Sequence, residues 1–495
     1  MKKQLLAACG LLIALAAVSC GSEPAQEPSG TPASDGSGSS NEETPSQPVY
    51  DIPEPELPER DYGGAAFTFY AAEPEEKDET VLFYEKDFLV SEGLTAEPVN
   101  DAVFNRNLKV EQKFNLKVKV LETDAKVDTL ILSGDTTIDM VAGDSVWFGD
   151  NMSSGIFLNF MDLPYVNLTA EYWSPLCVEG TRLDDKIYMM PSDITMLPLA
   201  SVGYLYFNKR ILNENDLENP YDMVYNNTWT IDNFLAMVRK ISQDLNGDGV
   251  MDAEDLYGYL PITGFRMGCY LQFFYGSGMK FTAEDEESGR VIAVDGDKAQ
   301  ELIDKLREVL EDHTICLDNV YIRDKFGDEL IFRNMFLEGH ALFTESNMAG
   351  MDQFREMEDD FGIVPNPKYD SSQESYFHRV SPHVSMFTIP ATAQDLDKTG
   401  AVMEYMSWLS HYTVLPAYYE ITVKQKRVRD EDAVAMLDII RKTMVFEFGD
   451  VYDSYIPNYL SNSYDDGSYS RRFAASLKIL NKRLAAYVRM IRALD

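Results

Sequence analysis

The chain has 495 residues and a formal net charge of −39 at pH 7. That length exceeds what one hydrophobic core usually serves, so at least two lobes or domains are expected. The acidic balance argues against nucleic acid as a partner, because phosphates need a basic face, and against electrostatic attachment to anionic lipid. Hydrophobic content of 45% with 12% aromatic residues is typical of a globular chain and excludes wholesale disorder.

The first twenty residues have the pattern of a bacterial secretion signal. Lys2 and Lys3 precede an apolar stretch over residues 5–17, which is too short to span a bilayer. The following Ala17-Val18-Ser19-Cys20 resembles a lipobox, which implies cleavage after residue 19 and diacylglycerol on the sulfur of Cys20, with palmitate as a further acyl chain. An ordinary secretory peptide with an incidental cysteine is the alternative.

Residues 20–61 are expected to form a disordered tether. They are rich in Pro, Ser and Gly, and almost all of their charged residues are acidic. Such a composition cannot bury enough apolar surface to offset the entropy of ordering. Acidic self-repulsion and proline extend the segment, so it would hold a folded body away from the membrane.

The remaining cysteines carry no sign of a metal site. Cys177, Cys269 and Cys316 are far apart, and no C-x-x-C spacing occurs. We expect them to be small buried hydrophobes.

Strands and helices alternate along the body, which predicts an α/β fold with sheets covered by helices. The expected strands cover residues 66–70, 116–121, 138–142, 186–191 and 202–209. The expected helices cover residues 100–114, a helix end at 129–132, residues 230–241, 299–310 and 396–409. Ligands of such sheets bind beyond the carboxyl ends of the strands, so the expected loop after Ala142 is of interest.

A series of motifs over residues 62–430 resembles the extracellular solute-binding proteins of ABC importers, in the group that includes sugar binders. In chain order the motifs begin at Gly143-Asp144, Tyr188-Met189-Met190-Pro191, Tyr206-Phe207-Asn208-Lys209, Thr228-Trp229-Thr230, Phe336-Leu337-Glu338-Gly339 and Phe361-Gly362-Ile363-Val364. The resemblance implies a type II periplasmic-binding-protein-like fold, in which hinge strands join two α/β lobes and a ligand cleft lies between them. It places the signal peptide at 1–19, lobe one at 62–190 plus 351–387, and lobe two at 191–350 plus 388–495. The crossings would lie near residues 190–198, 345–350 and 387–390.

The resemblance also suggests which residues hold the solute. Aromatic rings cover the apolar face of a sugar ring, while carboxylates and amides bind its hydroxyls. The expected ligand-binding residues lie after a strand, near the crossings or in later segments: Asp144, Trp147, Phe148, Ser192, Asp193, Tyr275, Asn347, Tyr455 and Tyr459. For Trp147 the alternative is a core role, and for Tyr455 and Tyr459 it is a tyrosine-rich surface loop. Trp229 and Trp408 lie in helical patterns and are expected to pack in the core.

The acidic loop over residues 244–255 matches a twelve-residue calcium loop. Side-chain oxygens fall at the ligand positions, Gly249 stands where the sharp turn needs it, and Val250 would ligate through its carbonyl. The expected ligands are Asp244, Asn246, Asp248, Val250, Asp252 and Asp255. The last replaces the usual Glu, and a turn without metal is the alternative.

Residues 471–495 form a basic segment with apolar residues at helical spacing. A helix that packs its apolar stripe on lobe two is expected, and membrane binding is the alternative. The sequence contains no P-loop, H-E-x-x-H or G-x-S-x-G motif. We therefore expect a monomeric, lipid-anchored receptor on the extracytoplasmic face, with no enzymatic activity, that delivers a mono- or oligosaccharide to an ABC permease. A secreted glycoside hydrolase and a carbohydrate adhesin are the alternatives.

Overall fold

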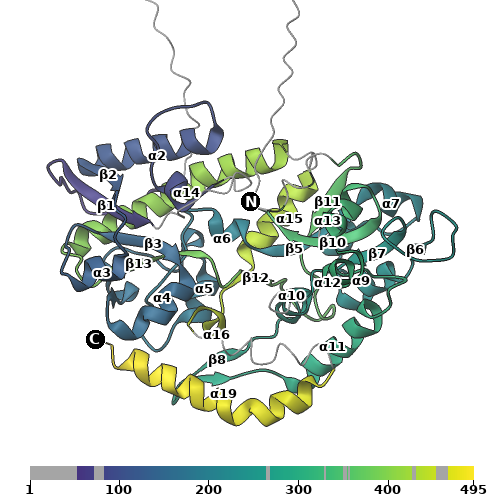
Figure 1. Ribbon diagram of the computed structural model, residues 1–495. Helices are drawn as coiled ribbons and strands as arrows, with labels where there is room; N and C mark the ends of the chain where they lie inside the picture. The colour runs from purple at the N-terminus through teal and green to yellow at the C-terminus, as the bar shows by residue number, and fades with distance from the viewer. Residues whose placement is uncertain are drawn as a thin grey trace, which may run out of the picture. The chain divides into compact units, whose positions relative to one another are not determined.

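The computed structural model describes residues 53–71, 83–263, 268–327, 330–348, 350, 354, 357–425, 431–452 and 467–494. Cys20 and the tether up to residue 52, together with Tyr455 and Tyr459, lie outside these residues. The described chain contains two five-stranded sheets, each with its own helices (Figure 1), and two two-stranded pairs. No helix within these ranges is both long and apolar enough to cross a membrane.

The first sheet has the order β2-β1-β3-β13-β4, and β1 pairs in parallel with both β2 and β3. Its strands are β1 (Ala65–Ala71), β2 (Leu116–Val120), β3 (Met140–Asp144), β4 (Phe157–Leu158) and β13 (Ser385–Pro390). β13 runs antiparallel to β3, in a register that pairs Ser385 with Asp144. The middle of β1 is buried on both faces, as expected of a parallel strand with helices on either side.

The second sheet has the order β11-β5-β10-β7-β6. Its strands are β5 (Gly203–Asn208), β6 (Ser242–Gln243), β7 (Leu256–Leu260), β10 (Ala341–Asn347) and β11 (Phe361–Val364). β10 pairs in parallel with β7 and antiparallel with β5, in a register that places Asn347 opposite Gly203. Two further pairs are formed by β8 (Thr282–Asp285) with β9 (Gly289–Ile292) and by β12 (His378–Arg379) with β14 (Met444–Val445).

Helices cover both sheets. Those of the first half are α1 (Glu85–Leu89), α2 (Pro98–Phe114), α3 (Val127–Leu132), α4 (Ser145–Asn151), α5 (Pro175–Thr181), α6 (Leu197–Ala200), α7 (Lys209–Glu214), α8 (Pro220–Tyr225) and α9 (Ile231–Val238). Those of the second half are α10 (Gly268–Gly276), α11 (Gly296–Leu310), α12 (Asn319–Phe326), α13 (Leu330–Leu337), α14 (Leu396–Gln425), α15 (Glu431–Lys442), α16 (Phe448–Val451) and α19 (Tyr469–Arg492). α14 packs along α2, and α19 packs on α11 and β9 (Figure 1).

Helix α2 shows how local sequence sets these elements. It begins with a proline in its first turn, and the Glu97 carboxylate accepts hydrogen bonds from the backbone N–H groups of Val99 (3.2 Å) and Asn100 (2.6 Å). It ends at Asn115, whose φ of 46° lies in the left-handed region that asparagine tolerates. Between these ends an apolar stripe is buried, so capping and periodicity agree.

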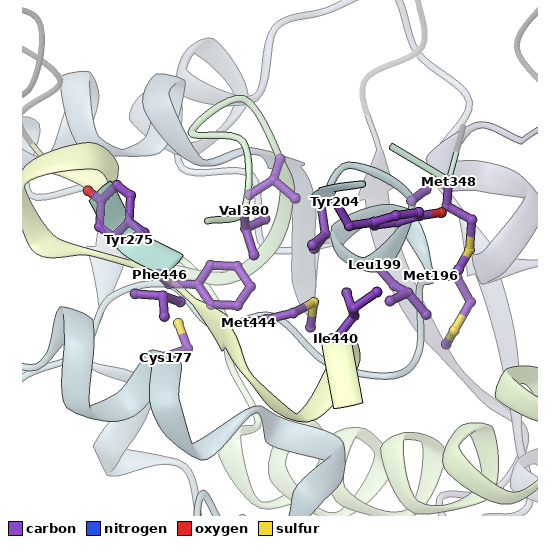
Figure 2. Close-up of a cluster of buried hydrophobic side chains, with 14 of the residues drawn as sticks. Cys177, Met196, Leu199, Tyr204, Tyr275, Met348, Val380, Ile440, Met444 and Phe446 are labelled. Atoms are coloured by element: carbon purple, nitrogen blue, oxygen red, sulfur yellow. The ribbon is translucent and has the colours of Figure 1, made fainter. Parts of the chain in front are cut away.

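Buried side chains from distant segments meet around the β12–β14 pair. Figure 2 shows Met444 and Phe446 near Val380, Cys177 and Ile440, all of which are buried. The three cysteines are free and buried, as the sequence predicts. Trp229 is also fully buried, and its indole N–H donates to the Pro365 carbonyl at 2.7 Å, so the expected core role is confirmed.

The chain passes between the two sheets at different residues from those expected. β11 pairs with β5, so residues 361–364 belong to the second sheet, whereas residues 351–387 were expected in lobe one. The chain leaves the second sheet only after β11, and not at residues 345–350. α14 packs along α2 beside the first sheet, although residues 388–495 were expected in lobe two. A short buried strand carries no local mark of its partner, which is why the sequence did not reveal this assignment.

Two local expectations are also corrected. Residues 186–191 form no ladder strand; only isolated bridges occur there, one of them between Met190 and Phe387. The expected loop at 143–150 is instead the end of β3 followed by α4. The reason is the Asp144 carboxylate, which caps α4 by accepting a hydrogen bond from the Trp147 N–H at 2.9 Å.

Candidate functional site

A cavity of about 340 Å³ is lined by residues from the ends of both sheets. That volume lies in the range of small-molecule sites. The lining residues are Phe83, Tyr84, Glu85, Asp144, Leu197, Ala200, Ser201, Asn347, His383, Val384 and Ser385. A cavity of about 390 Å³ also contains Phe83, but the rest of its lining comes from residues 87–100 and Ile421, without any residue of the second sheet.

Strand register brings these residues together. Asp144 is the last residue of β3 and pairs with Ser385, the first residue of β13, so His383 and Val384 enter the cavity beside Asp144. Asn347 is the last residue of β10 and pairs with Gly203, which places it near Ser201 just before β5. The cavity therefore lies beyond the carboxyl ends of β3 and β10, where ligands of α/β sheets bind.

Asp144 and His383 form a polar pair in the wall. One Asp144 carboxylate oxygen accepts the α4 capping bond, and the other lies 3.0 Å from His383 Nδ1. Both side chains are partly exposed, at 41% and 49% respectively. The pair therefore presents polar atoms to a solute in the cavity.

Glu85 is the second carboxylate of the wall. Its Oε2 is out of contact with solvent and has no hydrogen-bond partner among the described residues. Desolvation raises the pKa of Glu85 to about 7, against an interaction with the Ser385 hydroxyl that lowers it, and the charge of Asp144 adds a smaller increase. Oε2 of Glu85 is thus an acceptor without a partner among the described residues.

Arg106 holds α1, the helix that carries Glu85. Its fully buried guanidinium donates to the carbonyls of Phe88 (2.6 Å), Leu89 (3.3 Å) and Ile194 (3.2 Å). Burial lowers the pKa of Arg106 to about 9. Because α1 is only five residues long, these bonds rather than its own helical bonds fix its position.

The fold of this chain is similar to that of several solved structures. No family model and no curated protein matches the chain. Among solved structures, the maltose-binding periplasmic protein of Listeria monocytogenes, in complex with maltose, matches 85% of this chain and 98% of its own with a TM-score of 0.54 at 15% identity. A cyclo/maltodextrin-binding protein complexed with maltotetraose matches 85% of this chain and 97% of its own with a TM-score of 0.51 at 11% identity.

This chain has the two-lobe fold of the solute-binding proteins. The expected fold class is therefore confirmed.

Of the expected ligand-binding residues, Asp144 and Asn347 line the cavity, whereas Trp147 and Phe148 do not. Phe148 is only 1% exposed and packs against Phe157, while Trp147 is half-buried and contacts both rings. Because residues 145–151 form a helix rather than a loop, these two side chains join the core of the first sheet.

Ser192 and Asp193 lie outside the cavity and connect helices. The Ser192 hydroxyl lies 2.7 Å from that of Ser407 on α14. One carboxylate oxygen of Asp193 lies 2.6 Å from His411 Nδ1 on α14 and 3.8 Å from Arg441 on α15. Both residues are buried, and their contacts hold the segment after Met190 against α14 and α15.

Tyr275 is buried in a polar cluster away from the cavity. Its hydroxyl donates to Asp450 at 2.9 Å, and Asp450 also pairs with Arg379 at 2.8 Å. These bonds join α10, β12 and α16. Tyr275 therefore has a structural partner, whereas the expected role was ligand contact.

The expected calcium loop has a regular internal geometry. Asp244 accepts hydrogen bonds from the N–H groups of Gly247 (2.6 Å) and Gly249 (2.7 Å), and Gly249 has a φ of 81°, which a side chain would strain. Asp255 is fully buried and accepts from Leu245 (2.9 Å) and Asp252 (2.8 Å). Over the described residues, no group of three or more His, Cys, Asp or Glu side chains is arranged to hold a metal ion. Calcium stays a prediction from the sequence.

Sequence reasoning missed most of the wall, including Glu85, His383 and Ser385. His383 offered one signal, because it stands just before a buried strand. That signal becomes useful only when β13 is known to pair with β3. Glu85 offered none, since its place depends on bonds from Arg106 to the backbone of α1.

Proposed function

We propose that the protein captures a small solute, a carbohydrate in the first place, and delivers it to an ABC permease without altering it chemically. The observation that carries this proposal is the cavity, which residues at the ends of both sheets line together. Two structures of similar fold support it, since one holds maltose and the other maltotetraose. Mixed walls, with Phe83 and Tyr84 beside polar groups, are typical of such sites.

Capture would proceed by closure of the two lobes. A solute that contacts Asp144 and His383 on one side and Ser201 and Asn347 on the other binds most tightly when the sides are close. Ligand would therefore shift the population toward the closed state. The segments that connect the sheets, around residues 190–202 and 365–384, are where backbone angles would change.

The test is a thermal-shift screen of mono- and oligosaccharides with the mature chain, followed by calorimetry and product analysis. Saturable binding without turnover supports a receptor. Release of shorter sugars would favour the glycoside hydrolase. Binding only to long surface polysaccharides, with no effect of short sugars, would favour the adhesin.

The proposed location is the outer face of a bacterial membrane, with the lipid on Cys20 as the anchor. The apolar stretch before Cys20 and the Pro- and Ser-rich segment after it support this proposal. Metabolic labelling with an alkyne fatty acid should mark the wild-type protein and not Cys20→Ser. Labelling of both proteins would remove Cys20 as the anchor.

We also propose that loop 244–255 takes up calcium in a structural role. The spacing of Asp244, Asn246, Asp248, Val250, Asp252 and Asp255 supports it, since calcium prefers hard oxygen ligands at such positions. Calcium added to chelated protein should release or absorb heat and raise Tm, because binding to the native state alone stabilises it. Asp244→Ala should abolish both signals. Absence of heat and of a Tm change in the wild-type protein would overturn the proposal.

A further inference from the structure

The cavity wall carries two carboxylates and, among its described residues, no lysine or arginine. Its titratable residues are Tyr84, Glu85, Asp144 and His383, and no Lys or Arg is among its lining residues as far as the structure describes them. Lys86 follows Glu85 directly, but its ammonium group pairs with Glu122 at 2.6 Å. His383 already faces Asp144. Glu85 therefore has no lysine or arginine beside it in the wall.

The net charge of the whole chain adds to the preference of the cavity for cations. The net charge of −39 gives the protein a negative field, which attracts cations and repels anions at long range. A carboxylate or phosphate placed in the cavity would face Glu85 and Asp144 without a compensating lysine or arginine. Anionic solutes are accordingly disfavoured both on approach and when bound.

The unused oxygen of Glu85 indicates what the site lacks. A carboxylate oxygen out of contact with solvent is costly to leave without a donor. A neutral hydroxyl would donate one hydrogen bond, whereas a protonated amine would donate and also neutralise the charge. The effect is largest for a carboxylate whose pKa is raised by desolvation, as that of Glu85 is.

We propose that the cavity selects a solute that carries a protonated amine, bound beside Glu85 and Asp144, and that an amino sugar is the carbohydrate form of this solute. The inference rests on the proposed capture function and adds its charge selectivity. An ammonium group beside Glu85 favours the ionised carboxylate, so binding near pH 7 should release a proton from Glu85 to the buffer. Asp144, His383 and Tyr84 are the other titratable groups that face this position.

The experiment compares matched hexose, hexosamine and hexuronate oligosaccharides of one to four units by calorimetry at pH 7, in two buffers of different ionisation enthalpy. We expect the hexosamines to bind at least ~10-fold more tightly than their neutral counterparts, with proton release, and the uronates not to bind. Equal or tighter binding of neutral sugars or uronates overturns the inference and leaves capture standing. If no set binds, the proposed carbohydrate capture fails.

Variants separate Glu85 from a general structural effect. Glu85→Gln keeps the shape but loses the charge, so the preference for amine over neutral sugar should fall to within about threefold, and proton release should vanish. The matched control is Glu218→Gln at an exposed position far along the chain from α1, which should leave both unchanged. Asp144→Asn, which still caps α4 through its amide oxygen, is the second variant and should also lower the amine preference. Unchanged preference in both cavity variants would overturn the proposal.

Discussion

Two acidic regions of this molecule differ in what their carboxylates contact. In loop 244–255, Asp244 and Asp255 accept hydrogen bonds from backbone N–H groups of the same loop. In the cavity wall, one oxygen of Asp144 caps α4, while Glu85 Oε2 has no partner among the described residues. The first region is satisfied by its own backbone, and the second is not.

The difference shows how a carboxylate that backbone donors satisfy can be told from one that can still accept a hydrogen bond from a solute. Backbone N–H groups that point at a carboxylate stabilise the fold and hold the loop in one conformation. A carboxylate without such donors lowers stability, and it remains in the wall of a cavity that can admit a donor from outside. Substitutions of the carboxylates in loop 244–255 should therefore lower mainly stability. Substitutions of the carboxylates in the cavity wall should lower mainly solute affinity.

Arg106→Met tests the support of the cavity wall and should have the largest effect. The substitution leaves the carbonyls of Phe88, Leu89 and Ile194 without their donor, so we expect a loss of about 4 kcal/mol in unfolding free energy. Urea denaturation measures it. Arg471→Met, on the exposed side of α19, is the control and should change stability by less than ~0.5 kcal/mol. Similar values for the two variants would show that α1 is held by other contacts.

Asp255→Ala tests loop 244–255, in which backbone N–H groups satisfy the carboxylates. The side chain is fully buried, and its removal leaves the N–H groups of Leu245 and Asp252 without acceptors. We expect a loss of about 3 kcal/mol in unfolding free energy and no change in solute affinity. Asp248 in the same loop is exposed and, among the described residues, accepts a hydrogen bond only from Val250 N–H, so Asp248→Ala should cost about 1 kcal/mol or less. An equal loss of unfolding free energy in the two variants would show that the burial of Asp255 does not determine its contribution to stability.

Asp144→Ala should lower both stability and solute affinity, because the residue both caps a helix and lines the cavity. Loss of the cap on α4 should lower unfolding free energy by about 1 kcal/mol. Affinity for a bound solute should fall as well. Asp144→Asn should recover most of the stability, as its amide oxygen can accept the same bond, and should not recover affinity for an amine. Stability and affinity restored together would mean that Asp144 acts on the solute only through α4.

Much of the fold could be predicted from the sequence, because its signals are local. The strands at β1, β2 and β5 and the helices α2 and α9 follow from periodicity and caps, including Thr230 as the cap of α9. The apolar stripe of α19 likewise packs on α11 and β9. The assignment of β11 to the second sheet was not predictable, since partner choice depends on pairing between residues far apart in the chain.

The site was predictable only in part, for the same reason. Asp144 and Asn347 were found because each ends a strand or lies near an expected crossing. Trp147 and Phe148 were misplaced because the Asp144 cap turns the next residues into a helix. Glu85 joins the wall through contacts of Arg106 that no local pattern reveals.

Glu85→Gln should have the smallest effect on stability, and its sign should depend on pH. A carboxyl whose pKa is raised to about 7 on folding binds its proton more tightly in the native than in the unfolded state. The wild-type protein therefore loses stability as pH rises from the ordinary Glu range, near 4.5, through 7. The glutamine variant has no such proton, so the Tm of Glu85→Gln minus that of the wild type should increase between pH 5 and pH 8. Scanning calorimetry at the two pH values measures the difference. A flat difference for Glu85→Gln would mean that the cavity carboxylate is as well solvated as one on the surface.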